Sequence, residues 1–201
     1  MNDQLTETEI KFYIPDFSEI KKKLEALGAK CTKPRVYERN VRYENADKTL
    51  TEQGVVVRLR QDHAVKLTYK EPPSTLPDNP NISHRFEAEV EVSNYDTMDI
   101  ILNKLGYTPH IIYEKYRTTY QLSDVEIVLD EMPYGNFIEI EGSEQAIETA
   151  IVQFGIQNET RILQNYLQLF DTVKANLKLT VHDLTFANFD SIDVPLSAFG
   201  L

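Results

Sequence analysis

The stretch Glu7-Thr8-Glu9-Ile10-Lys11 decides the architecture expected for this chain. In a β-strand, alternate side chains point to the same face, so Glu7, Glu9 and Lys11 project together. Their two carboxylates lie about 6 to 7 Å apart along the strand, a spacing at which both can contact one divalent cation. A lysine on the same face can bind the anion that such a cation neutralises. Taken alone, the pentapeptide is equally compatible with a solvent-facing strand.

Same-sign charges at the spacing i, i+2 recur on the other predicted strands. Period-two alternation predicts these strands at 35–43, 55–60, 65–70, 85–92, 111–122, 125–130 and 137–141, the second and third forming a hairpin. Like charges at this spacing repel one another, and an exposed surface gains nothing from them. The repetition therefore indicates strand faces that share one site. The charged sets are Glu7/Glu9, Arg58/Arg60, Lys66/Lys70, Glu87/Glu89/Glu91, Lys115/Arg117 and Glu139/Glu141.

About eight mainly antiparallel strands with a few helices outside predict an α+β fold built on a closed β-barrel, because closure removes exposed strand edges. Helices are predicted near 16–27, 95–105, 143–155 and 159–173, the first with Asp16 as its N-cap. The segment 71–83 contains four prolines and cannot be a central strand. It predicts a long loop, and its position makes it a candidate lid over the mouth of the barrel.

The composition restricts the classes of function. The chain has 201 residues, of which 41% are hydrophobic and 26% charged, as expected for a folded domain. Its net charge of −11 argues against binding to nucleic-acid polymers or anionic membranes. The single Cys31 excludes an intramolecular disulfide and a metal site built from cysteines. No apolar run approaches membrane-spanning length and the N-terminus has no apolar leader, so we expect a cytoplasmic protein.

If the charged faces turn inward, basic side chains gather on one wall of the barrel and carboxylates on another. Guanidinium groups bind phosphate oxygens through paired donors, and lysines act as point charges. Carboxylates are the ligands that Mg²⁺ or Mn²⁺ prefers. The pattern therefore predicts a receptor for an extended polyanion together with a divalent metal ion.

In their order along the chain, the charged motifs resemble those of the CYTH superfamily of triphosphate tunnel metalloenzymes. Members include class IV adenylyl cyclases, thiamine triphosphatases and inorganic triphosphatases. The motifs are E-T-E-I-K at 7–11, R-L-R at 58–60, V-K-L-T-Y-K at 65–70, R-F-E-A-E at 85–89, E-K-Y-R at 114–117, and Leu129-Asp130 followed by G-N-F-I-E-I-E-G at 135–142. The resemblance runs from about residue 5 to 172. It implies a tunnel domain over 1–175 and leaves 176–201 as a C-terminal extension without an assigned role.

The resemblance implies an eight-stranded antiparallel tunnel that holds a triphosphate. The implied metal ligands are Glu7, Glu9, Glu139 and Glu141, with Asp130 assisting, and with Glu87 and Glu89 either binding a second metal or anchoring basic side chains. The implied phosphate-binding residues are Lys11, Arg58, Arg60, Lys66, Arg85, Lys115 and Arg117. Lys11, Arg58 and Lys66 are the catalytic candidates of this set. The general base stays open among a tunnel lysine, a tyrosine and hydroxide on the metal.

Three functions remain open from the sequence. The first is a metal-dependent phosphohydrolase acting on inorganic triphosphate, or on a nucleoside or thiamine triphosphate. The second is an adenylyl cyclase, in which the ribose 3′ hydroxyl attacks the α-phosphorus of ATP. The third is a non-catalytic binder of polyphosphate or nucleotide. No separate adenine signature is visible, which favours hydrolysis. The expected cofactor is Mg²⁺ or Mn²⁺ and the expected partner a small-molecule triphosphate, with room left for a homodimer.

Overall fold

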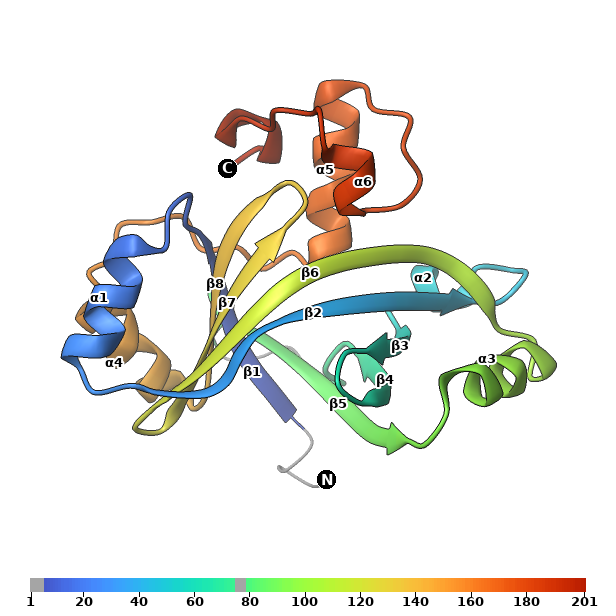
Figure 1. The fold of residues 1–201 in the computed structure, drawn as a ribbon, viewed down its shortest axis with the longest axis horizontal. Helices are drawn as coiled ribbons and strands as arrows, with labels where there is room; N and C mark the ends of the chain where they lie inside the picture. Colours follow the sequence, from blue (N-terminus) through green and yellow to red (C-terminus); the bar gives the residue numbers. More distant parts are fainter. Residues whose placement is uncertain (1–5, 75–78) are drawn as a thin grey trace.

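Eight antiparallel strands form a closed barrel in the computed structural model, which describes residues 6–74 and 79–201 (Figure 1). The order around the ring is β1-β5-β4-β3-β2-β6-β7-β8, and β8 pairs again with β1. The strands are β1 (Thr6–Tyr13), β2 (Lys30–Glu44), β3 (Val56–Gln61), β4 (Val65–Glu71), β5 (Ser83–Val92), β6 (Thr108–Leu122), β7 (Val125–Met132) and β8 (Gly135–Glu141). The α+β barrel predicted from the sequence is confirmed.

Helices cover the outside of the barrel (Figure 1). They are α1 (Ser18–Ala26), α2 (Thr49–Glu52), α3 (Tyr95–Lys104), α4 (Glu144–Phe154), α5 (Tyr166–Leu177), α6 (Phe186–Phe189) and the 3₁₀ helix η2 (Leu196–Phe199). Helices α1 and α4 pack against β1, β7 and β8, and α3 packs against β2 and β3. Within the described residues, no helix combines the length and apolarity needed to cross a membrane.

Much of the apolar core lies outside the barrel wall, between the strands and the helices. On β1, Ile10 and Phe12 are 0% exposed and pack toward α1 and α4, whereas Glu9 and Lys11 alternate with them and line the interior. Two more apolar clusters lie under α3 and under α5 with the C-terminal segment. The strands are therefore stabilised from outside, and the interior is left to polar side chains.

The C-terminal segment 178–201 closes a gap in the barrel wall. Strand β6 pairs with β2 along almost its whole length, but with β7 only from Tyr116 onward. Along the edge of β6 that β7 leaves open, the amide of Leu184 donates to the carbonyl of Ile112 at 2.9 Å, and the amide of Glu114 donates to the carbonyl of Leu184 at 3.0 Å. These bonds satisfy an edge that would otherwise be unpaired. The domain boundary near residue 175 stays a prediction.

Two predicted helices begin later than expected. Helix α1 begins at Ser18, and Asp16 accepts a hydrogen bond from the Ser18 amide at 3.0 Å in the turn before it, so Asp16 is not the N-cap. Helix α5 begins at Tyr166 and not at 159, because Ile162 forms a β-bridge with Lys11 that keeps the chain extended. Part of the proline-rich loop, 75–78, lies outside the described residues, so the lid hypothesis stays a prediction.

The substitution Leu184→Ala tests the sealing role of the C-terminal segment. Leu184 is 0% exposed and belongs to the apolar cluster under α5. Its truncation should lower the free energy of unfolding by about 2–5 kcal/mol, measured by denaturant titration. The control Leu196→Ala, on a side chain that is 50% exposed in the same segment, should change stability by less than about 0.5 kcal/mol. Equal effects of the two substitutions would contradict the assignment.

Candidate functional site

A cavity of about 340 Å³ lies inside the barrel and brings the predicted site residues together. All seven residues predicted to bind phosphate line it: Lys11, Arg58, Arg60, Lys66, Arg85, Lys115 and Arg117. Six of the seven predicted metal ligands line it as well: Glu7, Glu9, Glu87, Glu89, Glu139 and Glu141. The seventh, Asp130, is 0% exposed and is covered by Lys115, Arg117 and Tyr166, which line the cavity. The roles of these residues stay predictions, whereas their convergence on one cavity is a feature of the structure.

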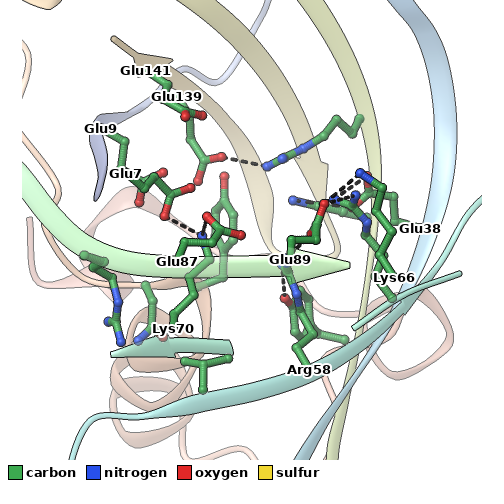
Figure 2. Close-up of a pocket in the computed structure, with 18 of the residues that line it drawn as sticks. Glu7, Glu9, Glu38, Arg58, Lys66, Lys70, Glu87, Glu89, Glu139 and Glu141 are labelled. Atoms are coloured by element: carbon green, nitrogen blue, oxygen red, sulfur yellow. Dashed lines mark hydrogen bonds and ion pairs between the residues drawn. The ribbon is translucent and has the colours of Figure 1, made fainter. Parts of the chain in front are cut away.

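Carboxylates crowd one wall of the cavity, where β1 and β8 meet. Figure 2 shows Glu7, Glu9, Glu139 and Glu141 gathered on one side. Glu9 lies directly opposite Glu141 in the β1–β8 register, and Glu126 of β7 lies opposite Glu141 on its other side. Burial raises the pKa of Glu141, and Glu7, Glu126 and Glu9 add to the rise, to about 7. Like charges held face to face in this way repel one another and destabilise this wall.

The donor set of this wall fits a hard divalent cation. Within residues 6–74 and 79–201, no three His, Cys, Asp or Glu side chains already surround one point. Nevertheless Glu7, Glu9 and Glu141 supply only carboxylate oxygens, which Mg²⁺ and Mn²⁺ prefer. Burial also raises the pKa of Glu9, and the charges of Glu139 and Glu7 add to the rise against the opposing effect of Lys11. A bound cation would relieve this repulsion.

Next to this wall, basic side chains are held in a buried network of ion pairs. Glu139 accepts hydrogen bonds from Lys11 at 2.9 Å and from Arg117 at 2.6 Å. Burial would raise the pKa of Glu139, but Lys11 and Arg117 outweigh burial and hold the pKa well below its ordinary value. Asp130 accepts from Lys115 at 3.0 Å, from Arg117 at 2.7 Å and from the hydroxyl of Tyr166 at 2.8 Å. These contacts orient the basic residues, and the metal role of Asp130 stays a prediction.

A second network holds the basic residues of β3 and β4 against β5 (Figure 2). Glu89 accepts from Lys66 at 2.7 Å and from Thr68 at 2.8 Å, and lies 3.4 Å from a guanidinium nitrogen of Arg60. Burial would raise the pKa of Glu89, but these partners outweigh it and lower the pKa to about 2. Glu87 pairs with Lys70 at 2.8 Å. Both contacts correspond to the anchoring alternative that the sequence left open for Glu87 and Glu89.

Several cavity residues were missed by the sequence reading. Glu38 and Arg42 of β2 line the cavity at strand spacing, but their opposite signs hid them from a search for like charges. Burial would raise the pKa of Glu38, yet Lys115, Arg117 and Arg60 lower it to about 2. Tyr113 lies two residues before Lys115 on β6 and therefore points to the same face. Strand alternation alone could have placed it in the cavity. Of the described residues, no histidine lines the cavity.

Tyr166 was missed for a different reason, because it enters the cavity from the first turn of α5. The ammonium groups of Lys11 and Lys115 lie 4.6 Å and 5.4 Å from the centre of its ring. Its hydroxyl donates to Asp130. No local pattern in the sequence predicts these contacts, because they depend on where α5 packs against the barrel.

Comparisons with known proteins agree on one family. The model of the CYTH domain matches residues 5–166. A candidate adenylate cyclase of Methanocaldococcus jannaschii is 30% identical over 142 residues, which are 69% of this chain and 78% of that protein.

Solved structures share the fold. A candidate adenylate cyclase of Vibrio parahaemolyticus matches with a TM-score of 0.69 at 18% identity, covering 82% of this chain and 97% of its own. A candidate adenylyl cyclase of Hippeastrum, described as revealing a dominant triphosphatase activity, matches with a TM-score of 0.59 at 20% identity over 82% and 95% of the two chains.

The substitution Glu141→Gln tests the repulsion on the acidic wall. The pKa of Glu141 lies near 7 in the folded chain against an ordinary value of 4.5, so between these values the folded state binds the proton more tightly. In buffer that contains a metal chelator, the free energy of unfolding should therefore fall as pH rises from about 4.5 to about 7. The variant loses this contribution, so its stability should exceed that of the parent protein by more at pH 8 than at pH 5, as measured by denaturant unfolding. The exposed Glu25→Gln on α1 is the control, and an unchanged pH slope in Glu141→Gln would contradict the assignment.

Proposed function

The chain belongs to the CYTH family, and from that premise and the charges of its tunnel we propose that it is a metal-dependent phosphohydrolase acting on a triphosphate. One observation carries the proposal. Within a single cavity, a carboxylate wall faces a wall of basic side chains, and in the carboxylate wall Glu9 and Glu141 lie opposite each other without an ion-pair partner among the described residues. An extended polyanion with a divalent cation complements both walls at once.

Unused hydrogen-bond donors in the cavity support a phosphate ligand. The buried Nε atoms of Arg58, Arg60 and Arg85 have no hydrogen-bond partner among the described residues. Leaving a buried donor unsatisfied costs about 1–3 kcal/mol, and more when the group is charged. Phosphate oxygens would satisfy all three donors, since guanidinium groups bind them through charge-assisted bonds.

The basic residues would stabilise the charge that develops during hydrolysis. When bound by Glu7, Glu9 and Glu141, the metal would neutralise phosphate charge and polarise the phosphoryl group. Arg58 and Lys66 reach the cavity from β3 and β4 and would bind the oxygens of the phosphate that leaves. Glu89 anchors Lys66 and keeps its ammonium group in position before the substrate arrives.

The lining favours hydrolysis over cyclisation, because it offers little to a purine ring. Among the described lining residues, the only aliphatic side chains are Val56 and Leu167. The ring of Tyr166 already contacts two ammonium groups. A cyclase reaction on ATP remains the alternative, supported by the name of the Methanocaldococcus jannaschii relative.

Product analysis tests the proposal. Purified protein is incubated with Mg²⁺ or Mn²⁺ and, separately, with tripolyphosphate, ATP and thiamine triphosphate. Orthophosphate release from one of these is the expected result. Cyclic AMP with pyrophosphate from ATP would establish the cyclase instead. Tight tripolyphosphate binding without any turnover would identify a non-catalytic binder.

The substitution Glu9→Gln tests the part played by the acidic wall. Glu9 has no ion-pair or hydrogen-bond partner among the described side chains, so its loss should leave the basic networks intact. We expect turnover to fall at least about a hundredfold, because a metal ligand is lost. Tripolyphosphate binding in a chelator should be unchanged or stronger. Unchanged turnover would remove Glu9 from the metal site, and Glu25→Gln again serves as the control.

A further inference from the structure

Three basic residues that line the cavity, Arg42, Arg85 and the exposed Lys33, form no ion pair within the described part of the chain, and Arg42 and Arg85 are the two that lie together. Lys11, Lys66 and Lys115 each form an ion pair with a carboxylate. Within the described part of the chain, no carboxylate oxygen lies within 4 Å of a side-chain nitrogen of Arg42 or Arg85, although both line the cavity. Their positive charge is therefore available to a ligand.

These two guanidinium groups converge from different strands on two consecutive backbone carbonyls. Arg42 of β2 donates to the carbonyl of Val55 at 3.1 Å. Arg85 of β5 donates to the carbonyl of the preceding Gly54 at 2.6 Å. In the ring, β2 lies four strands from β1 in either direction, so Arg42 starts from the wall opposite Glu9. The convergence places two cations at the side of the tunnel where β3 begins.

Arg58 and Tyr113 complete the cluster. Arg58 lies directly opposite Arg42 in the β2–β3 register and donates to the hydroxyl of Tyr113 at 3.2 Å. Having accepted this bond, the hydroxyl keeps its own proton for a further acceptor. The buried Nε atoms of Arg58 and Arg85 lack a partner among the described residues. The cluster therefore holds several donors in excess of its acceptors.

The three guanidinium groups of the cluster repel one another. Burial lowers the pKa of Arg42, and the nearby charges of Arg85 and Arg58 lower it further. Like charges directly opposite one another on neighbouring strands destabilise a sheet. An anion bound among the three guanidinium groups would reverse this effect, since each can form charge-assisted hydrogen bonds to phosphate oxygens.

We propose that Arg42, Arg58, Arg85 and Tyr113 form a phosphate subsite beside Gly54 and Val55, and that Arg42 binds the phosphoryl group farthest from the carboxylates of β1 and β8. The inference rests on the proposed triphosphate ligand and adds a residue, Arg42, that holds one end of it. The alternative role for Arg42 is purely structural, in which its guanidinium group only donates a hydrogen bond to the Val55 carbonyl.

The test measures binding of inorganic tripolyphosphate by calorimetry in a chelator, where no metal-dependent turnover occurs. In Arg42→Gln, the amide can still donate to the Val55 carbonyl, but the charge is lost. Affinity should fall about tenfold to a hundredfold, as expected for loss of a charge-assisted bond. The melting temperature without ligand should rise, because repulsion from Arg58 and Arg85 is removed. Weaker binding together with a more stable apo protein is a combination that a structural cap cannot produce.

Two further variants distinguish loss of the subsite from a general effect of removing an arginine. Arg35→Gln removes an exposed arginine that pairs with Glu131 and does not line the cavity. This variant should bind tripolyphosphate with unchanged affinity and should not show the rise in melting temperature expected for Arg42→Gln. Tyr113→Phe should weaken binding severalfold while keeping the ring packed. If Arg42→Gln fails to fold, Tyr113→Phe decides, and unchanged affinity in that variant would overturn the subsite.

The remaining outcomes separate this inference from the proposed function. Wild-type affinity in Arg42→Gln overturns the subsite even if triphosphate is hydrolysed normally. A wild-type protein that does not bind tripolyphosphate overturns it as well. Binding that is lost in Arg42→Gln, in a protein that hydrolyses none of the triphosphates, supports the subsite and overturns the hydrolase.

Discussion

The pairing of the first strand with the last is the interaction on which the rest of the molecule depends. Strand β1 joins β8 through five register pairs, among them Lys11 with Glu139 and Glu9 with Glu141. The side chains of Lys11 and Glu139 are only 4% and 10% exposed. A buried ion pair of this kind contributes less to stability than to a unique strand register. A shift of the β1–β8 register by one residue would turn its charges to the apolar outer face of the barrel. The same closure places the carboxylates of two distant segments in one wall.

The barrel largely separates stability from function, because most of its apolar core lies outside and its charges lie inside. Clusters under α1 with α4, under α3, and under α5 stabilise the strands. The interior can then hold charges that are incompletely compensated. Among the described residues, Glu9 and Glu141 on one side and Arg42 and Arg85 on the other form no ion pair. Glu89 and Asp130 neutralise the basic residues between them. The two unbalanced regions are the places where a metal ion and a phosphate would each lower the energy of the protein.

Sequence patterns predicted what local geometry determines. Glu7, Glu9 and Lys11 were assigned to one face because alternation on a strand requires it, and the barrel followed from the number of strands. Asp130 shows the limit, since it shares the inward face of β7 with Glu126 but is buried beneath three cavity residues from β6 and α5. Tyr166 enters from a helix whose start depends on a bridge between Ile162 and Lys11. Such positions arise from packing between segments that are distant in the sequence, so the periodicity of the sequence does not predict them.

Closure of the ring also has a consequence for synthesis and folding. Strand β1 emerges first from the ribosome, yet its partner β8 follows only after six other strands have been made. Pairing at this sequence separation raises the contact order, and high contact order slows folding. Until Gly135–Glu141 arrives, the nascent chain keeps an open sheet edge at β1, which is a template for association with other chains. The charges of Glu7, Glu9 and Lys11 lie along that edge, so the residues that line the mature cavity also discourage edge-to-edge aggregation before the barrel closes.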